Sequence, residues 1–107
     1  MAIDVHRISG RMRGTRSATL RDQITRAAMS VPSNIVEGNA HASPHEFARY
    51  LRYAVASATE VEGHAQLARD LGIMDNADFT AVLDRVVDVR KMLHGLLKKL
   101  GKRTTDN

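Results

Sequence analysis

The sequence predicts an all-α protein, an antiparallel up-and-down four-helix bundle whose first helix is short. Two observations support this prediction. The 107 residues include two prolines, seven glycines, two Tyr, two Phe and no Trp, too few for the aromatic strands and frequent turns of a β-sheet domain. Apolar residues also recur at alternating intervals of three and four positions, which is the spacing of one helix face. A chain of this length forms one domain, residues 1–107.

The first predicted helix covers residues 2–13 and is only about three turns long. Ile3 or Val5, together with Ile8 and Met12, lies on one side of it. Because so short a helix is marginal in water, it depends on packing against the rest of the bundle.

The second predicted helix spans residues 17–41, with Ser17 as its N-cap. Pro32 lies in its interior, removes one backbone hydrogen bond and predicts a kink. Two separate helices are the alternative, but the apolar spacing continues across Pro32 and favours one kinked helix. The positions that form its apolar stripe are Leu20, Ile24, Ala27, Val31, Ile35 and Gly38.

The third predicted helix, residues 44–71, begins at a capping box. The Ser43 hydroxyl accepts from the amide of Glu46, Pro44 takes the first helical position, and the Glu46 side chain reaches back. Gly72 supplies the left-handed residue that ends the helix. The small-residue heptad seam, which we expect to allow close approach of a neighbouring helix, consists of Phe47, Leu51, Ala54, Ala58, Val61, Ala65 and Ala68.

Residues 75–100 form the fourth predicted helix, capped by Asp75 or Asn76. Its short connection to the third helix makes the two antiparallel. Gly101 ends the apolar pattern, and residues 101–107 are expected to form a mobile tail. The apolar positions of this helix are Phe79, Val82, Leu83, Val86, Val89, Leu93, Leu96, Leu97 and Leu100.

Composition excludes several classes of protein. The chain is 43 % hydrophobic, but it has no apolar run of the ~20 residues that a membrane helix needs, and its first residues lack the apolar core of a signal peptide. The absence of cysteine excludes disulfides, thiolate nucleophiles and cysteine zinc sites. We therefore expect a cytoplasmic protein without a membrane partner.

Charge is unevenly distributed, although the net charge is only +4. Residues 1–30 contain six Arg against two Asp, residues 31–80 three Arg against seven acidic residues, and residues 81–107 seven Lys or Arg against three Asp. If the two basic ends pack side by side, they form a surface that attracts phosphate. The alternative is that these side chains only solvate exposed faces. The candidate nucleic-acid-binding residues are Arg7, Arg11, Arg13, Arg16, Arg21, Arg26, Lys98, Lys99, Lys102 and Arg103.

The segment QITRAAMSVPSNIVEGNAHASPHEFARYLRYAVASATEVEGHAQLARDLGI, residues 23–73, is more distinctive than its composition. It resembles the four-helix-bundle proteins encoded within intervening sequences of bacterial 23S ribosomal RNA genes. The residues that carry the resemblance are Gln23, Arg26, Ala27, Ala28, Ser30, Pro32, Ser33, Asn34, Ile35, Glu37, Gly38, Ser43, Glu46, Phe47, Leu67, Ala68, Leu71 and Gly72.

The resemblance implies a cytosolic bundle that assembles as a ring, typically a homopentamer. Accessory proteins of diversity-generating retroelements look like relatives of this family, and those proteins bind nucleic acid and a reverse transcriptase. The resemblance thus predicts a fold and an assembly rather than an activity.

Polar side chains gather around Pro32. Ser30, Ser33 and Asn34 can provide partners for the carbonyls near Pro32, and Glu37 can pair with an arginine of a neighbouring helix or protomer. The residues that we assign to an oligomer interface or a structural motif are Ser30, Pro32, Ser33, Asn34, Glu37, Gly38, Tyr50 and Tyr53.

Tyr50 and Tyr53 lie close to Arg49 and Arg52 in the sequence. This combination can stack nucleic-acid bases, although it is also typical of a protomer contact or of an ordinary surface. The three interpretations remain open at this point.

The sequence predicts no catalytic residue, no cofactor and no metal site. Glu37 has no matched base or nucleophile. Glu37, His41 and His45 are spaced four apart, but Pro44 and the Ser43 cap interrupt any common helix. Phosphate-binding loops and nucleophile elbows are also absent from the sequence.

These observations predict a non-enzymatic, homo-oligomeric bundle, expected to be a pentamer, that binds RNA or DNA or a ribonucleoprotein partner through basic surfaces. The alternative is a purely structural scaffold that contacts protein partners and binds no nucleic acid.

Overall fold

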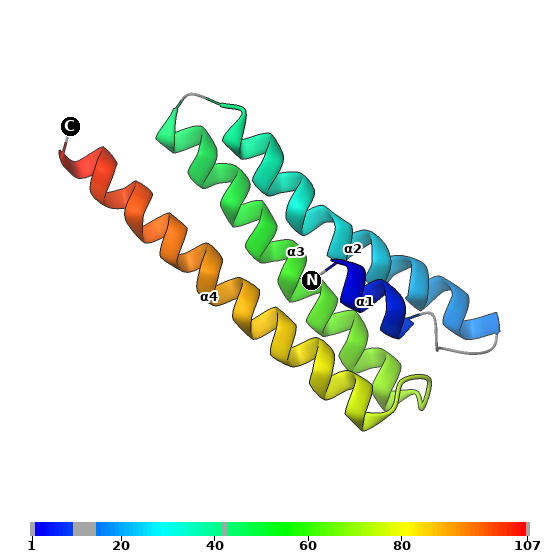
Figure 1. The fold of residues 1–107 in the computed structure, drawn as a ribbon. Helices are drawn as coiled ribbons and strands as arrows, with labels where there is room; N and C mark the ends of the chain where they lie inside the picture. The colour runs from blue at the N-terminus through cyan, green and yellow to red at the C-terminus, as the bar shows by residue number, and fades with distance from the viewer. Residues whose placement is uncertain (1, 10–14, 42, 107) are drawn as a thin grey trace.

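The computed structural model describes residues 2–9, 15–41 and 43–106. Four helices follow one another: α1 (Ala2–Ser9), α2 (Thr15–Asn39), α3 (Pro44–Asp70) and α4 (Asn76–Asp106). α3 packs against both α2 and α4, and α1 lies against α2 and touches α4 (Figure 1). The predicted antiparallel four-helix bundle with a short first helix is therefore confirmed.

The bundle is long and narrow, with extents of 53 × 20 × 17 Å. No Cα atom of α2 lies within 8 Å of one of α4 in the described chain, so α3 forms the centre and α2 and α4 flank it. The C-terminal end of α4 lies at the same end of the bundle as the connection between α2 and α3 (Figure 1). None of these helices has the length and apolar character required to span a membrane.

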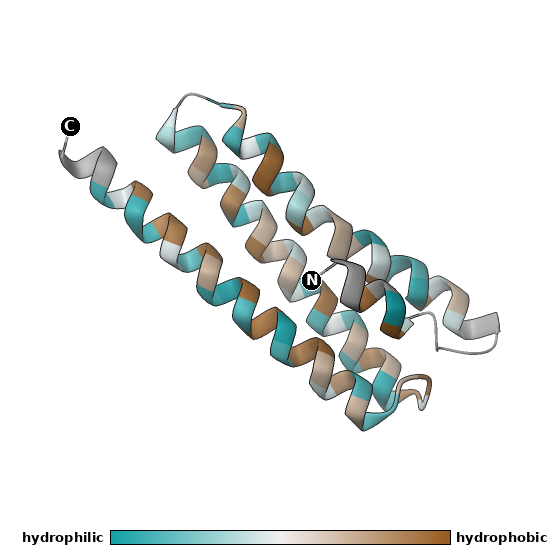
Figure 2. Ribbon diagram, viewed as in Figure 1, coloured by the Kyte–Doolittle hydropathy of each residue, from teal (hydrophilic) through white to brown (hydrophobic). Residues whose placement is uncertain are grey.

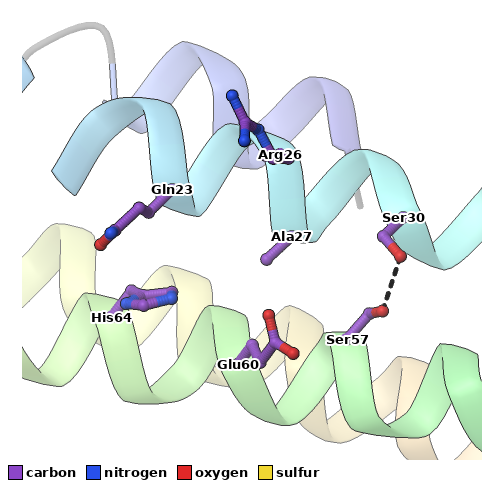
Figure 3. Close-up of a pocket in the computed structure, with 7 residues that line it drawn as sticks. All are labelled: Gln23, Arg26, Ala27, Ser30, Ser57, Glu60 and His64. Carbon is purple, nitrogen blue, oxygen red and sulfur yellow. Dashed lines mark hydrogen bonds between the residues drawn. The ribbon is translucent and has the colours of Figure 1, made fainter. Parts of the chain in front are cut away.

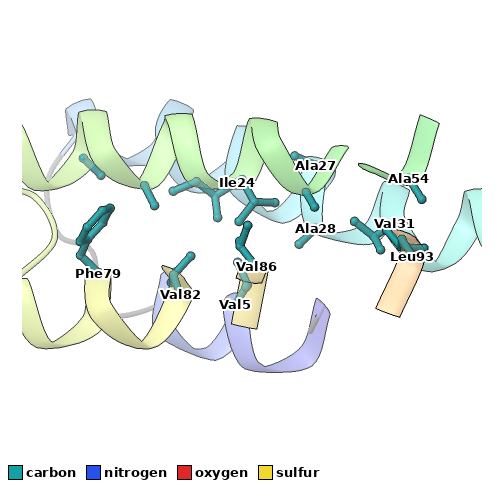
Figure 4. Packing of buried hydrophobic residues seen from close by; sticks show 14 of the residues in the cluster. Val5, Ile24, Ala27, Ala28, Val31, Ala54, Phe79, Val82, Val86 and Leu93 are labelled. Carbon is teal, nitrogen blue, oxygen red and sulfur yellow. The ribbon is translucent and has the colours of Figure 1, made fainter. Parts of the chain in front are cut away.

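The core consists of the apolar stripes that the sequence predicts (Figure 4). Along α3, every predicted seam position from Leu51 to Ala68 is buried, and Phe47 is half-buried. Val5 of α1 is fully buried and contributes to the same core, whereas Ile3 and Met12 lie outside the described side chains. Apolar segments alternate with hydrophilic ones along the helices (Figure 2), as expected when only one face of each helix is buried.

α2 is one continuous helix with Pro32 in its interior, so the alternative of two helices is wrong. It begins at Thr15 and not at Ser17, whose side chain is buried instead of capping the helix. At the other end the chain leaves α2 through tightened turns, in which the amide of His41 donates to the Gly38 carbonyl at 3.2 Å.

The caps of α3 and α4 are largely as predicted. The Glu46 amide donates to the Ser43 hydroxyl at 3.5 Å, while the Glu46 carboxylate binds Arg49 at 2.8 Å and does not reach back to the cap. Gly72 adopts φ +73°, the left-handed conformation expected of a helix stop. Of the two candidate caps for α4, Asp75 is the N-cap, because its Oδ1 accepts a hydrogen bond from the Asp78 amide at 2.7 Å.

The predicted end of the fourth helix at Gly101 is wrong. α4 continues through Gly101 to Asp106, so residues 101–106 belong to a helix. A glycine ends a helix when it turns into the left-handed region, and Gly72 is the only described glycine that does so. In mid-helix, glycine costs only about 1 kcal/mol relative to alanine.

Gly38 fixes the approach of α2 to α3. A Cβ atom at this position would lie 2.8 Å from the Tyr50 Cβ and 2.9 Å from the Phe47 Cδ1. Since Tyr50 Cβ is attached directly to the α3 backbone, it cannot rotate away. Only glycine, which has no side chain, fits at this position. Gly38 is one of the residues that carry the family resemblance, and this packing is the physical reason for a glycine there.

We predict that Gly38→Ala lowers the free energy of unfolding by about 1–3 kcal/mol, because the added methyl group overpacks the α2–α3 contact. Gly63→Ala is the matched control, since a Cβ at that exposed helical position meets nothing within 4 Å. It should stabilise the protein by about 0.5–1 kcal/mol. Urea unfolding followed by circular dichroism measures both, and equal effects of the two substitutions would contradict the packing argument.

Candidate nucleic-acid interface

The two basic ends of the chain do not pack side by side, so the condition under which they would form one basic surface is not met. Gln23 and Arg26 line a groove with Glu60 and His64, whereas Leu97 and Gly101 line a cavity with His45. Fifteen residues of α3 separate His45 from Glu60, which is about 22 Å along a helix. Because α2 and α4 run in the same direction, the start of α2 and the end of α4 lie at opposite ends of the bundle.

The candidate basic residues are therefore dispersed. Among the described side chains, Arg7 and Arg26 are exposed and Arg21 is half-buried. Arg11 and Arg13 lie outside the described residues. Arg16 belongs to α2 and Arg103 to α4, and both lie outside the described side chains. The three lysines near the end of α4, which are Lys98, Lys99 and Lys102, are all exposed.

The packing instead places the part of α4 that carries Lys98 and Lys102 beside the first turns of α3. His45 and Arg52 of α3 line one cavity of about 130 Å³ together with Leu97 and Gly101 of α4. In the sequence, Lys98 is the residue after Leu97 and Lys102 is the residue after Gly101. On α3, positions 45, 49 and 52 share one face. We call the set His45, Arg49, Arg52, Lys98 and Lys102 the basic face.

An aromatic cluster borders the basic face. The His41 ring stacks on Tyr50, with 5.1 Å between centroids and an interplanar angle of 11°. The Tyr53 ring meets Tyr50 edge-on at 5.6 Å. The Arg49 guanidinium lies 5.3 Å from the Tyr50 centroid and 6.0 Å from that of Tyr53. Tyr53 is 47 % exposed, so this tyrosine cluster presents an aromatic side chain beside positive charge.

The polar motif around Pro32 serves the contact between α2 and α3. The Ser30 and Ser57 hydroxyls lie 2.7 Å apart (Figure 3). The Ser57 hydroxyl donates to the Tyr53 carbonyl at 3.0 Å, so its single proton is used and Ser30 is the donor between the two serines. The Asn34 amide then donates to the Ser30 hydroxyl at 3.0 Å and to the Ser30 carbonyl at 2.8 Å.

The motif residues thus divide into two groups. Ser30, Asn34, Gly38 and Tyr50 make contacts within the chain. Pro32, Ser33 and Glu37 are exposed, and Tyr53 is exposed although its ring also meets that of Tyr50. Ser57 is buried, but the sequence alone did not identify it as a residue of the motif. A polar residue within an alanine-rich seam is a feature from which its buried hydrogen bond could have been predicted.

The groove between α2 and α3 is a weaker candidate for phosphate binding. It has a volume of about 290 Å³ and is open to solvent. Arg26 and Glu60 both line it (Figure 3), so an anion there meets a carboxylate as well as a guanidinium. Among the described residues, no group of three His, Cys, Asp or Glu side chains is arranged to hold a metal ion.

Comparison with known proteins identifies one family. The sequence model of the family described as 23S rRNA-intervening sequence protein matches residues 1–95. No curated protein matches the chain significantly. The matched region includes all of α1, α2 and α3, while the lysines of the basic face lie just beyond it.

We predict that the serine pair stabilises the bundle cooperatively. Ser57→Ala should lower the free energy of unfolding by about 1–2 kcal/mol, because it leaves the Ser30 hydroxyl without its acceptor. The double variant Ser30→Ala/Ser57→Ala should cost less than the sum of the single changes. Ser33→Ala, on the exposed side of the same helix, is the control and should change stability by less than about 0.5 kcal/mol. Strictly additive effects at positions 30 and 57 would refute the coupling.

Proposed function

Because the chain belongs to the 23S rRNA-intervening sequence protein family, we propose that it is a non-enzymatic, homo-oligomeric bundle of the cytoplasm that binds nucleic acid through its basic face. A ribonucleoprotein can present the same phosphate backbone and is an equivalent partner. The assembly is expected to be a pentamer, which is the state that the family resemblance implies.

One observation carries the binding proposal: the basic face and the tyrosine cluster lie side by side at one end of the bundle. Lysine and arginine side chains attract backbone phosphate without reading the base sequence. Exposed aromatic rings and arginine planes stack with unpaired bases. The combination favours a single-stranded nucleic acid, since bases in a duplex are already stacked on one another.

Local charge supports this interpretation. The Glu46 carboxylate is the acidic group beside Arg49 and binds it through an exposed ion pair, which is worth little in water. Phosphate can replace such a partner at low cost. In an oligomer the face is repeated, so weak individual contacts combine into stronger binding.

We predict that a labelled mixed-sequence RNA strand binds with an affinity that falls as salt rises. Arg52→Gln/Lys98→Gln should weaken binding and reduce the slope of log affinity against log salt by about 1.4, which is about 0.7 for each phosphate that the variant no longer neutralises. Gln66→Glu/Thr80→Glu is the matched control, because it changes the net charge equally at exposed positions far from the basic face.

The same titration separates stacking from charge. Tyr53→Ala should cost about 1–3 kcal/mol of binding free energy and leave the salt slope unchanged. Fluorescence anisotropy measures both quantities. Absence of RNA binding at low salt, in a protein that still assembles, would contradict the proposal and favour the alternative of a protein-binding scaffold.

A further inference from the structure

The outer face of α2 carries an apolar stripe that no other helix of the described chain covers. Met29 is 53 % exposed and Val36 70 % exposed, and Pro32 between them is exposed as well. These positions follow the i, i+3, i+7 spacing of a helix-packing seam. We call Met29, Pro32 and Val36 the α2 seam.

A second stripe with the same spacing lies on α4. Val89 and Leu96 are half-buried at the edge of the core, and Met92 between them is 50 % exposed. We call these three residues the α4 seam. α2 and α4 flank α3 without approaching each other, so the two seams cannot meet within one chain.

The two seams lie at the same height along the bundle. Ser30 of α2 is level with Ser57 of α3, to which it is hydrogen-bonded. Arg90 of α4 contacts Thr59 at 3.4 Å and Glu62 at 2.7 Å, and both of these residues lie within about one and a half helical turns of Ser57. Met29 and Met92 therefore lie at nearly equal heights.

The charges beside the seams are complementary. Arg26 precedes Met29 by three positions and Asp88 precedes Met92 by four, so these opposite charges lie within about 1.5 Å of the same height, which is the rise of one residue. Glu37 follows Met29 by eight positions and Lys99 follows Met92 by seven, which gives a second pair of opposite charges at nearly the same height. All four side chains are exposed.

From this juxtaposition we infer that the α2 seam of one copy packs against the α4 seam of the next copy, with Arg26 beside Asp88 and Glu37 beside Lys99. The inference deepens the proposed homo-oligomer and rests on it. Because the contact joins two different faces, neighbouring copies are arranged head-to-tail. Because the two seams lie at equal heights along the bundle, a rotation with no shift along the axis relates one copy to the next. Such a contact closes a ring instead of growing into a filament.

The arrangement leaves the basic face free. Lys98 and Lys102 share one side of α4, four positions apart, whereas Lys99 lies about 100° around the helix from Lys98. Of these three lysines, only Lys99 takes part in the contact between the seams. A ring built in this way displays the basic face once in every copy.

The cysteine-free chain permits a direct test by disulfide cross-linking. Met29→Cys/Met92→Cys places the two thiols too far apart to bond within one chain, because a disulfide needs Cα atoms within about 7 Å. Oxidation should yield a ladder of covalent oligomers on a non-reducing gel, ending at the ring size. Met29→Cys/Leu67→Cys is the control, since Leu67 is similarly exposed at 47 % but lies on α3, and it should give no ladder.

A charge-reversal series provides the second measurement. Glu37→Lys and Lys99→Glu should each lower the mass measured by light scattering, and the double variant should restore it. An oligomer that gives no ladder from the 29/92 pair, or that is not restored by the double reversal, would overturn the seam contact and leave the proposed oligomer intact. A monomeric unsubstituted protein would overturn both.

Discussion

The close approach of α2 and α3 is the constraint on which the rest of this structure depends. Small residues make it possible: Ala27 and Gly38 on α2 and an alanine-rich seam on α3. Because little side-chain volume separates the two backbones, the Ser30 and Ser57 hydroxyls come within 2.7 Å of each other. The same proximity brings His41 onto the ring of Tyr50, so the stacking of His41 on this tyrosine is a consequence of the packing.

The alternation of helix directions then decides where charge accumulates. α3 runs opposite to both of its neighbours, which places the last turns of α4 against the first turns of α3. Lysines near the end of the chain thereby join arginines from its middle. The arginines in the N-terminal part of α2 carry the same charge as the α4 lysines, but they lie at the other end of the bundle. The places where positive charge gathers on the surface of this protein consequently depend on helix topology more than on net charge.

α3 is the central helix, and this position leaves two outer faces available. α2 and α4 each cover one side of α3, and α2 leaves Met29 and Val36 exposed while α4 leaves Met92 exposed. The basic face lies across α3 and α4, separate from the seam stripes. The proposed nucleic-acid binding and the proposed assembly therefore use different surfaces of one small domain, so substitutions can test the two proposals separately.

The sequence by itself determined the four helices and most of the residues that they bury, because the spacing of apolar residues along a helix is a local property. Leu51 through Ala68 on α3 and the left-handed Gly72 needed no knowledge of their neighbours. Helix ends were less predictable, as Ser17 and Gly101 illustrate, since differences of about 1 kcal/mol decide them. Only the tertiary structure decided that Ser57 meets Ser30 and that Leu97 lines the same cavity as Arg52, because helix direction and relative height set which distant residues become neighbours.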